Sequence, residues 1–170
     1  MSGSVIVVTT NGREYIVNWI VVLIETENLR KRAAMFTVLV IEDNPLHSKL
    51  FAEILRHHGY RVVPASDGPE GISLARREPP DLMIVDCYLR SAHGIDVVRA
   101  IRADDVLRCT PIIATSAFAD EDDRMALQAL QCVAYVAKPV SVGPFIATVE
   151  SVLNGTTEAQ RRPPVQISPA

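Results

Sequence analysis

The chain has 170 residues, 48% of them hydrophobic and 22% charged, which is typical of a globular protein with one main domain. Its 17 Lys and Arg residues against 20 Asp and Glu residues give a net charge of −3, and this balance argues against direct nucleic-acid binding as the main function. No apolar stretch approaches the roughly 20 residues that cross a bilayer. Residues 1–10 lack a signal-peptide pattern, and the three cysteines show no redox or metal spacing. We therefore expect a cytoplasmic protein that does not contact a membrane.

Short apolar runs alternate with segments of helical periodicity from residue 36 onward. Each run is of strand length, and we expect strands at residues 36–41, 61–65, 81–85, 112–116 and 134–137. Helices are expected from Asn44-Pro45 to Gly59, from Asp67-Gly68 to Arg77, from Gly94 through Ile101, from residues 120–123 through Leu130, and from Val142 to Leu153. This alternation predicts an α/β fold with a doubly wound parallel sheet.

Both ends of the chain fall outside this pattern. Residues 154–170 are rich in Thr, Pro, Gln and Arg, which predicts a disordered tail. Near the N-terminus, Asn11-Gly12 is a turn signal typical of β-hairpins. Residues 1–34 are therefore either a real hairpin extension or the product of a start site chosen upstream of Met35. In either case the domain that carries the function is expected at residues 35–153.

Charged and hydroxyl side chains stand at the ends of four predicted strands. Glu42 and Asp43 follow the first strand, Asp86 follows the third, Ser116 ends the fourth, and Lys138 follows the fifth. The carboxyl ends of parallel strands meet at one edge of the sheet, so we expect these side chains to converge. Taken singly, each has an ordinary interpretation as a turn cap, a solvated charge or a strand exit. Together, and in this order, they indicate a site.

The residue types in this group suit phosphoryl transfer. Three crowded carboxylates repel one another unless a cation balances them, and a hard cation such as Mg²⁺ prefers carboxylate oxygens. A lysine ammonium binds phosphate oxygens as a point charge, and a hydroxyl can donate a hydrogen bond to another oxygen. An aspartate in such a nest can act as a covalent acceptor, with positioning and electrostatics supplying the catalysis.

The motifs that carry these residues resemble the receiver domain of two-component response regulators. They are V-I-E-D-N-P (40–45), P-D-L-M-I-V-D (80–86), Gly94, I-I-A-T-S-A-F-A (112–119) and A-Y-V-A-K-P (134–139). The stretches K-L-F-A-E-I-L (49–55), Gly59-Tyr60 and K-P-V-S-V (138–142) further resemble stand-alone cell-division regulators of the DivK type. The resemblance implies a flavodoxin-like sheet of five parallel strands in the order 2-1-3-4-5, with helices on both faces.

The resemblance also implies a role for each site residue. Asp86 would be the phosphoacceptor, and Lys138 the phosphate contact. The ligands of Mg²⁺ would be the carboxylates of Glu42, Asp43 and Asp86 and the backbone carbonyl of Tyr88.

A conformational switch is the second implication. Ser116 would be the switch hydroxyl because Ala117 follows it, and Thr115 is the alternative if the register differs by one residue. Tyr135 matches the aromatic residue whose rotation is coupled to that hydroxyl.

The implied function is that of a single-domain response regulator, not an enzyme. A histidine kinase or a histidine phosphotransfer protein would supply the phosphoryl group. A downstream protein partner would read the switch through the face formed by the fourth helix, the fifth strand and the last helix. Tyr88 and Phe118, two residues after Asp86 and Ser116, are bulky aromatics that we expect to slow hydrolysis of the phosphorylated state.

The sequence departs from the family pattern in two loops. Arg90 stands where proline is usual, and Gln131 and Val133 replace a common Gly and Asp. Two other functional classes stay open. An aspartyl-nucleophile phosphohydrolase usually needs a second acid where this chain has Tyr88, and a receiver-like scaffold would work without phosphorylation.

Overall fold

The computed structural model describes the backbone of residues 5–10, 13–18, 36–90, 93–117 and 121–161, and the side chains of residues 36–90, 93–117 and 121–155. Its main sheet has five parallel strands in the order β4-β3-β5-β6-β7. The strands are β3 (Thr37–Ile41), β4 (Arg61–Ala65), β5 (Leu82–Asp86), β6 (Ile112–Ser116) and β7 (Ala134–Ala137). This is the expected order 2-1-3-4-5, which confirms the doubly wound, flavodoxin-like α/β fold.

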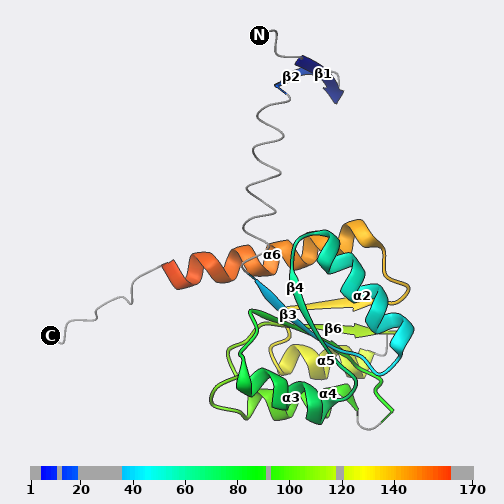
Figure 1. Cartoon of the computed structure of the whole chain (residues 1–170), viewed down its shortest axis with the longest axis vertical. Helices are drawn as coiled ribbons and strands as arrows, with labels where there is room; N and C mark the ends of the chain where they lie inside the picture. The colour runs from blue at the N-terminus through cyan, green and yellow to red at the C-terminus, as the bar shows by residue number, and fades with distance from the viewer. Residues whose placement is uncertain (1–4, 11–12, 19–35, 91–92, 118–120, 162–170) are drawn as a thin grey trace, which may run out of the picture.

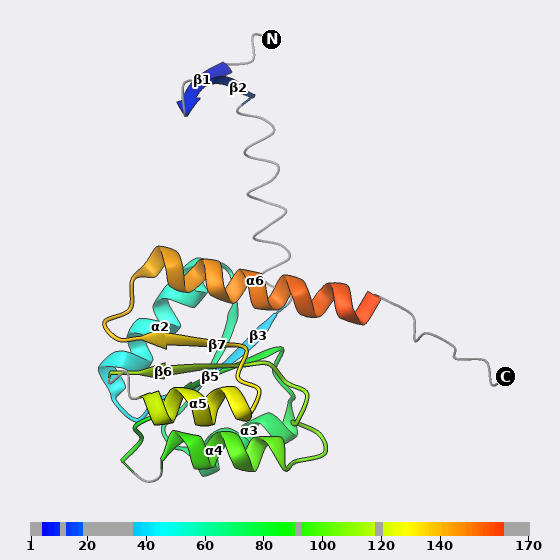
Figure 2. The ribbon, with the colours of Figure 1, turned by 180° about the vertical axis from the view of Figure 1, so that it is seen from behind.

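Five helices cover the two faces of this sheet. They are α2 (Pro45–His57), α3 (Gly68–Arg77), α4 (Gly94–Arg102), α5 (Glu121–Ala129) and α6 (Val142–Arg161). Helices α2 and α6 lie on one face, and α3, α4 and α5 lie on the other (Figure 1 and Figure 2). The central strands β3 and β5 are buried on both faces, which explains why their sequences are almost continuously apolar, whereas the edge strands β4 and β7 are partly exposed.

The two cores lie on opposite sides of the sheet. Between the sheet and helices α2 and α6, the rings of Phe51 and Phe145 pack with centroids 5.4 Å apart. On the other side, Met83 of β5, Ile101 of α4 and Leu107 are fully buried in the core between the sheet and helices α3, α4 and α5. The sheet is therefore fixed from both faces, and the polar residues at its carboxyl edge are held in place.

Local capping places two helix starts next to that edge. The side chain of Asn44 accepts hydrogen bonds from Leu46 N at 3.0 Å and His47 N at 3.4 Å, so α2 begins directly after the acidic pair. A Cβ atom at Gly94 would lie 2.0 Å from the carbonyl oxygen of Asp86, so only glycine lets α4 start this close to the end of β5.

The N-terminal segment contains a pair of strands, and the last helix is longer than expected. Strands β1 (Val5–Thr10) and β2 (Arg13–Asn18) form an antiparallel pair, as the hairpin interpretation of residues 1–34 predicts, while the turn and residues 19–35 lie outside the described residues. The expected tail is corrected at its start, because α6 continues past Leu153 to Arg161. Residues 162–170 lie outside the described residues.

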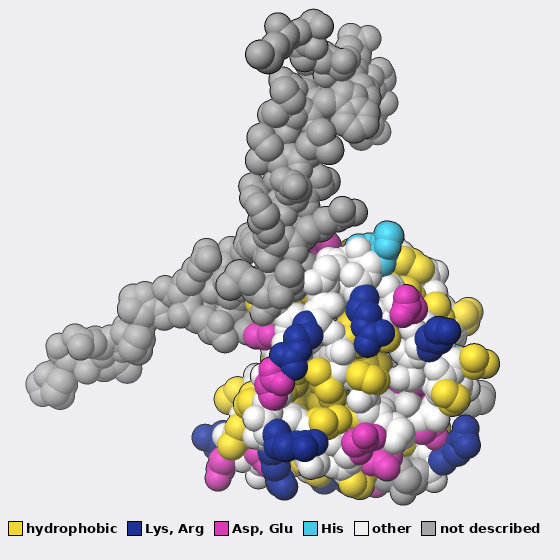
Figure 3. All heavy atoms as spheres, viewed as in Figure 1, with side chains coloured by type: hydrophobic (Ala, Val, Ile, Leu, Met, Phe, Trp, Pro, Cys, Tyr) yellow, Lys and Arg dark blue, Asp and Glu magenta, His cyan; other side chains and the backbone are white. Residues whose placement is uncertain are grey.

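Two features of the structure concern possible binding to nucleic acids and membranes: the distribution of surface charge and the character of the helices. On the face shown in Figure 3, basic and acidic side chains are interspersed and do not gather in one positive patch. Among the described residues, no helix combines the length and apolar character needed to cross a membrane.

Candidate functional site

The strand register brings the four predicted strand ends together. Asp86 pairs with Thr115, which in turn pairs with Val136. Hydrogen bonds of the sheet continue past the strand ends: Cys87 N donates to Thr115 O and Lys138 N donates to Ser116 O, both at 2.8 Å. These backbone bonds place the residues after β5 and β7 on either side of the end of β6.

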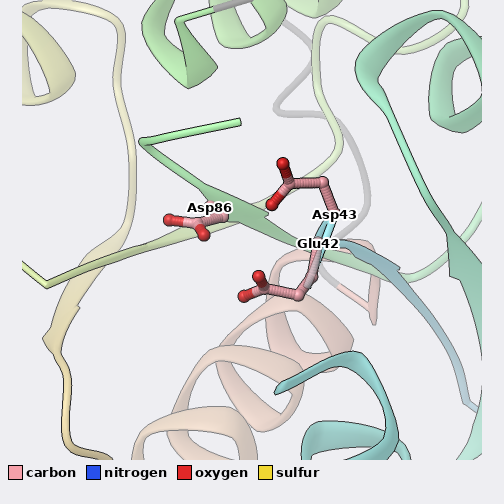
Figure 4. Close-up of side chains that lie close together, drawn as sticks. All are labelled: Glu42, Asp43 and Asp86. Carbon is pink, nitrogen blue, oxygen red and sulfur yellow. The ribbon is translucent and has the colours of Figure 1, made fainter. Parts of the chain in front are cut away.

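Three carboxyl groups converge at this edge. One oxygen each from Glu42, Asp43 and Asp86 lies within 4.8 Å of the other two. The carboxyl groups come from the ends of β3 and β5 and point into the same space (Figure 4). The predicted acidic nest is therefore present in the structure.

Lys138 sits against two of these carboxylates. Its Nζ donates to Asp86 Oδ2 at 2.8 Å and to Glu42 Oε2 at 2.6 Å. Glu42 is only 2% exposed and Asp86 only 5%, so both ion pairs are shielded from solvent. The expected approach of the Lys138 amine to the Asp86 carboxyl is confirmed.

Burial and charge perturb the ionisation of this group. Burial raises the pKa of the Glu42 carboxyl and the charge of Asp86 adds to the rise, although the hydrogen bond from Lys138 opposes it. Burial alone would lower the pKa of Lys138, but hydrogen bonds to Asp86 and Glu42 outweigh this effect and raise it. Lys138 is therefore held as an ammonium.

The donor set fits a hard divalent cation. The three carboxylates face two cations, the Lys138 ammonium and the Arg90 guanidinium beside Asp43, which leaves an excess of negative charge. Oxygen ligands with excess negative charge are those that Mg²⁺ prefers.

The loop after β5 attaches to Asp43 in a way the sequence did not reveal. Asp43 Oδ2 accepts a hydrogen bond from Arg90 N at 2.8 Å, and Arg90 Nε lies 3.3 Å from the same oxygen. Proline, the usual residue of the family at this position, has no N–H to donate. The departure at Arg90 therefore adds one backbone contact and one cation to the acidic nest.

Tyr88 contacts the site through its backbone N–H, whereas the expected role of its backbone carbonyl as a metal ligand stays a prediction. Its N–H donates to Asp86 Oδ1 at 3.2 Å. Its phenol hydroxyl donates to Asp123 Oδ2 at 2.7 Å, a contact with α5 that sequence reasoning missed. His47 was missed too: its Nδ1 lies 3.5 Å from Lys138 Nζ, because α2 begins immediately after the acidic pair.

The two candidate switch hydroxyls are both buried but lie on opposite faces of β6. Side chains alternate along a strand, so Ser116 shares the face of Ala114, on the side of α3, α4 and α5, where Tyr135 also packs. Thr115 shares the other face with Ile113, and its Oγ1 has no hydrogen-bond partner among the described residues.

Tyr135 and Phe118 complete the predicted set. Tyr135 is half-buried, and the guanidinium of Arg124 lies 5.6 Å from the centre of its ring. Phe118 lies outside the described residues, so its place at the site stays a prediction.

Comparison with known proteins agrees with this geometry. The profile of the family described as "Response regulator receiver domain" matches residues 38–150. The polar-differentiation response regulator DivK of Brucella anthropi is 38% identical over 117 residues, which cover 69% of this chain and 95% of the relative. DivK of Brucella ovis has the same identity and coverage.

Solved structures show the same fold. The chemotaxis protein CheY4 of Vibrio cholerae superposes with a TM-score of 0.67 at 24% identity, covering 69% of this chain and 98% of that one. The receiver domain of a sensor histidine kinase from Pseudomonas aeruginosa gives a TM-score of 0.65 at 31% identity, covering 70% and 98%. That neighbour has a magnesium ion coordinated in its active-site cleft. The fold, the acidic nest with its lysine, and the profile match agree, and the chain belongs to the family of response regulator receiver domains of two-component signalling.

Proposed function

We propose that this protein is a response regulator that accepts a phosphoryl group on Asp86. The observation that carries the proposal is the meeting of the Lys138 amine with the buried carboxylates of Asp86 and Glu42. Membership of the receiver family and the resemblance to DivK support it further.

The acceptor step follows from the side chains of the site. A carboxylate oxygen of Asp86 attacks the phosphorus of a phosphohistidine on a histidine kinase or a histidine phosphotransfer protein. The P–O bond to Asp86 forms as the P–N bond breaks, and the electron pair leaves with the imidazole nitrogen, which takes up a proton. Lys138 neutralises charge on the transferred group, because its ammonium already contacts Asp86.

A bound Mg²⁺ would neutralise phosphoryl oxygens during transfer. Asp43, Asp86 and the backbone carbonyl of Tyr88 would hold it, with Glu42 as a further carboxylate. The three carboxylates outnumber the two cations beside them, Lys138 and Arg90, and this excess supports the ligand set.

We assign the switch to Ser116 and Tyr135. Both lie on the sheet face that α5 covers, so a movement of the Ser116 hydroxyl toward the phosphoryl group frees space next to Tyr135. The change is read by a downstream protein at the surface formed by α5, β7 and α6. The relatives named as polar-differentiation regulators suggest a DivK-type role.

We further propose that Tyr88 and Phe118 slow hydrolysis of the phosphorylated state. In hydrolysis a water oxygen attacks phosphorus in line with the bond to Asp86, and the Asp86 carboxylate leaves. Bulky aromatic rings at these two sequence positions would obstruct the water. Replacing both residues, Tyr88→Asn with Phe118→Glu, should shorten the lifetime of the phosphoryl group, and an unchanged hydrolysis rate would refute this role.

The central experiment is intact-mass measurement after incubation with acetyl phosphate and Mg²⁺. The wild type should gain the mass of one phosphoryl group, while Asp86→Asn and the wild type with a chelator should gain none. An unlabelled but folded wild type would favour a scaffold that works without phosphorylation. Sustained turnover of a small phosphate ester would favour a phosphohydrolase instead.

A further inference from the structure

Tyr88 makes hydrogen bonds in two directions. Its backbone N–H donates to Asp86 Oδ1 at 3.2 Å, and its phenol donates to Asp123 Oδ2 at 2.7 Å. Asp123 stands in the first turn of α5, whereas Tyr88 is the second residue after Asp86. One residue thus connects the proposed phosphoacceptor with a helix of the proposed output surface.

The ring of Tyr88 is positioned by its own loop. Tyr88 and His93 form an isolated antiparallel bridge, and their rings meet edge to face with centroids 6.1 Å apart. This contact fixes the direction of the ring, so that the hydroxyl reaches α5. A phenol bound to a carboxylate forms a charge-assisted hydrogen bond, which is stronger than one between neutral groups.

The next residue of α5, Arg124, contacts Tyr135, the aromatic residue that we assign to the switch. The Arg124 guanidinium lies 5.6 Å from the ring centre of Tyr135 on β7. Consecutive residues of α5 therefore attach the helix to the loop after β5 and to β7. A change in either attachment alters the position of the helix start.

Asp123 is connected to the phosphoacceptor through Tyr88, because Tyr88 donates to Asp86 Oδ1 with its N–H and to Asp123 Oδ2 with its phenol. A phosphoryl group adds negative charge to Asp86 and so increases the repulsion acting on Asp123.

We propose that the Tyr88–Asp123 hydrogen bond is a latch that holds the start of α5 in its unphosphorylated position and opens when Asp86 is phosphorylated. This inference rests on the proposed function. The latch stabilises only the unphosphorylated state. By linkage, removing its hydrogen bond shifts the equilibrium toward the phosphorylated state by the factor that the bond contributed. For one hydrogen bond to a partly exposed carboxylate, we expect a factor of about three to ten.

The first test measures the affinity for beryllofluoride, a phosphoryl mimic, at saturating Mg²⁺ by titration calorimetry. Tyr88→Phe removes only the hydroxyl, and Asp123→Asn removes the charge of its acceptor. Tyr88→Phe should bind beryllofluoride about three- to tenfold more tightly than the wild type. Asp123→Asn should show a smaller gain, because its amide oxygen can still accept a weaker, neutral hydrogen bond. The double variant should match Tyr88→Phe, because that substitution already removes the bond. Glu121→Gln is the matched control, since it removes one negative charge from the same helix turn, and it should bind as the wild type does.

The second test needs neither metal nor mimic. Amide hydrogen exchange in the first turn of α5 should be faster in Tyr88→Phe and Asp123→Asn than in the wild type and Glu121→Gln. A purely structural contact would loosen α5 without changing the affinity for beryllofluoride, and that result overturns the latch.

The remaining outcomes are distinct. If the wild type binds beryllofluoride but the variants bind it equally well, the latch is wrong while the proposed function stands. Additive effects in the double variant would mean that the two residues act independently, which also overturns it. A folded wild type that binds no beryllofluoride overturns the proposed function and the latch together.

Discussion

Replacement of Thr115 by valine tests both the packing of β6 and the assignment of the switch hydroxyl. Thr115 is 1% exposed, and its Oγ1 has no hydrogen-bond partner among the described residues. A buried polar group without a partner costs about 1–3 kcal/mol, and valine has nearly the same shape as threonine. We therefore expect Thr115→Val to raise the free energy of unfolding by about 1 kcal/mol, which corresponds to a rise in Tm of roughly 3–6 °C.

The assay is urea unfolding of the wild type, Thr115→Val, Thr115→Ser and Ser116→Ala. Thr115→Ser keeps the hydroxyl but loses a buried methyl group, so its stability should fall by roughly 1 kcal/mol. Ser116 takes part in an interaction, whereas the Thr115 hydroxyl has no hydrogen-bond partner among the described residues. Ser116→Ala should therefore not stabilise the protein. A loss of stability in Thr115→Val would refute this reasoning, because it would mean that the Thr115 hydroxyl is satisfied.

The same variants separate the two register alternatives for the switch. If Ser116 is the switch hydroxyl, Thr115→Val should accept a phosphoryl group from acetyl phosphate as the wild type does and respond normally at α5, β7 and α6. Ser116→Ala should then lose the response. The opposite pattern would reassign the switch to Thr115.

Three further predictions follow from the site and its surroundings. Arg90→Ala keeps the backbone N–H but removes the cation 3.3 Å from Asp43 Oδ2. Because the Arg90 side chain is 80% exposed, we expect the binding free energy of Mg²⁺ to improve by about 1 kcal/mol or less, which is up to about fivefold in affinity. Calorimetry at low salt measures this gain, and the control Arg108→Ala should show none. Lys138→Met leaves two buried carboxylates without their ammonium, so the free energy of unfolding at neutral pH should fall by about 3–5 kcal/mol in urea titrations, and a loss below about 1 kcal/mol would contradict the ion pairs. Burial raises the pKa of Cys87 to about 12 and that of Cys132 to about 11, so both thiols stay protonated at pH 8. A thiol reagent should therefore label the exposed Cys109 first. Rapid labelling of Cys87 in the folded protein would count against its burial.

The convergence of the site could be predicted because it depends on topology. Once the apolar runs are assigned to parallel strands, Glu42, Asp86 and Lys138 must reach the same edge, whatever the loops between them do. Side-chain alternation likewise separates Ser116 from Thr115.

The attachments made by loops could not be predicted. The contact between Tyr88 and Asp123 joins residues 35 positions apart, and no sequence period relates them. Arg90 stood out as a departure, but its hydrogen bond to Asp43 depends on the backbone path after β5.

The length of α6 shows how composition can mislead. Thr, Gln and Arg after Leu153 are typical of a tail, yet α6 continues to Arg161. An established helix gains one backbone hydrogen bond for each added residue, so it can extend through polar residues that would not start a helix.

Lys138 explains why this site must be a compromise between stability and function. Its ammonium is the counter-ion of both Asp86 and Glu42, and the fold depends on it for burying those carboxylates. In the proposed function the same ammonium also binds a phosphoryl group on Asp86, so phosphorylation would make Asp86 and Glu42 compete for one cation. A divalent metal held by Glu42 and Asp43 would relieve this competition. The excess of carboxylates over cations at the site therefore predicts that the proposed phosphorylated state depends on a divalent metal.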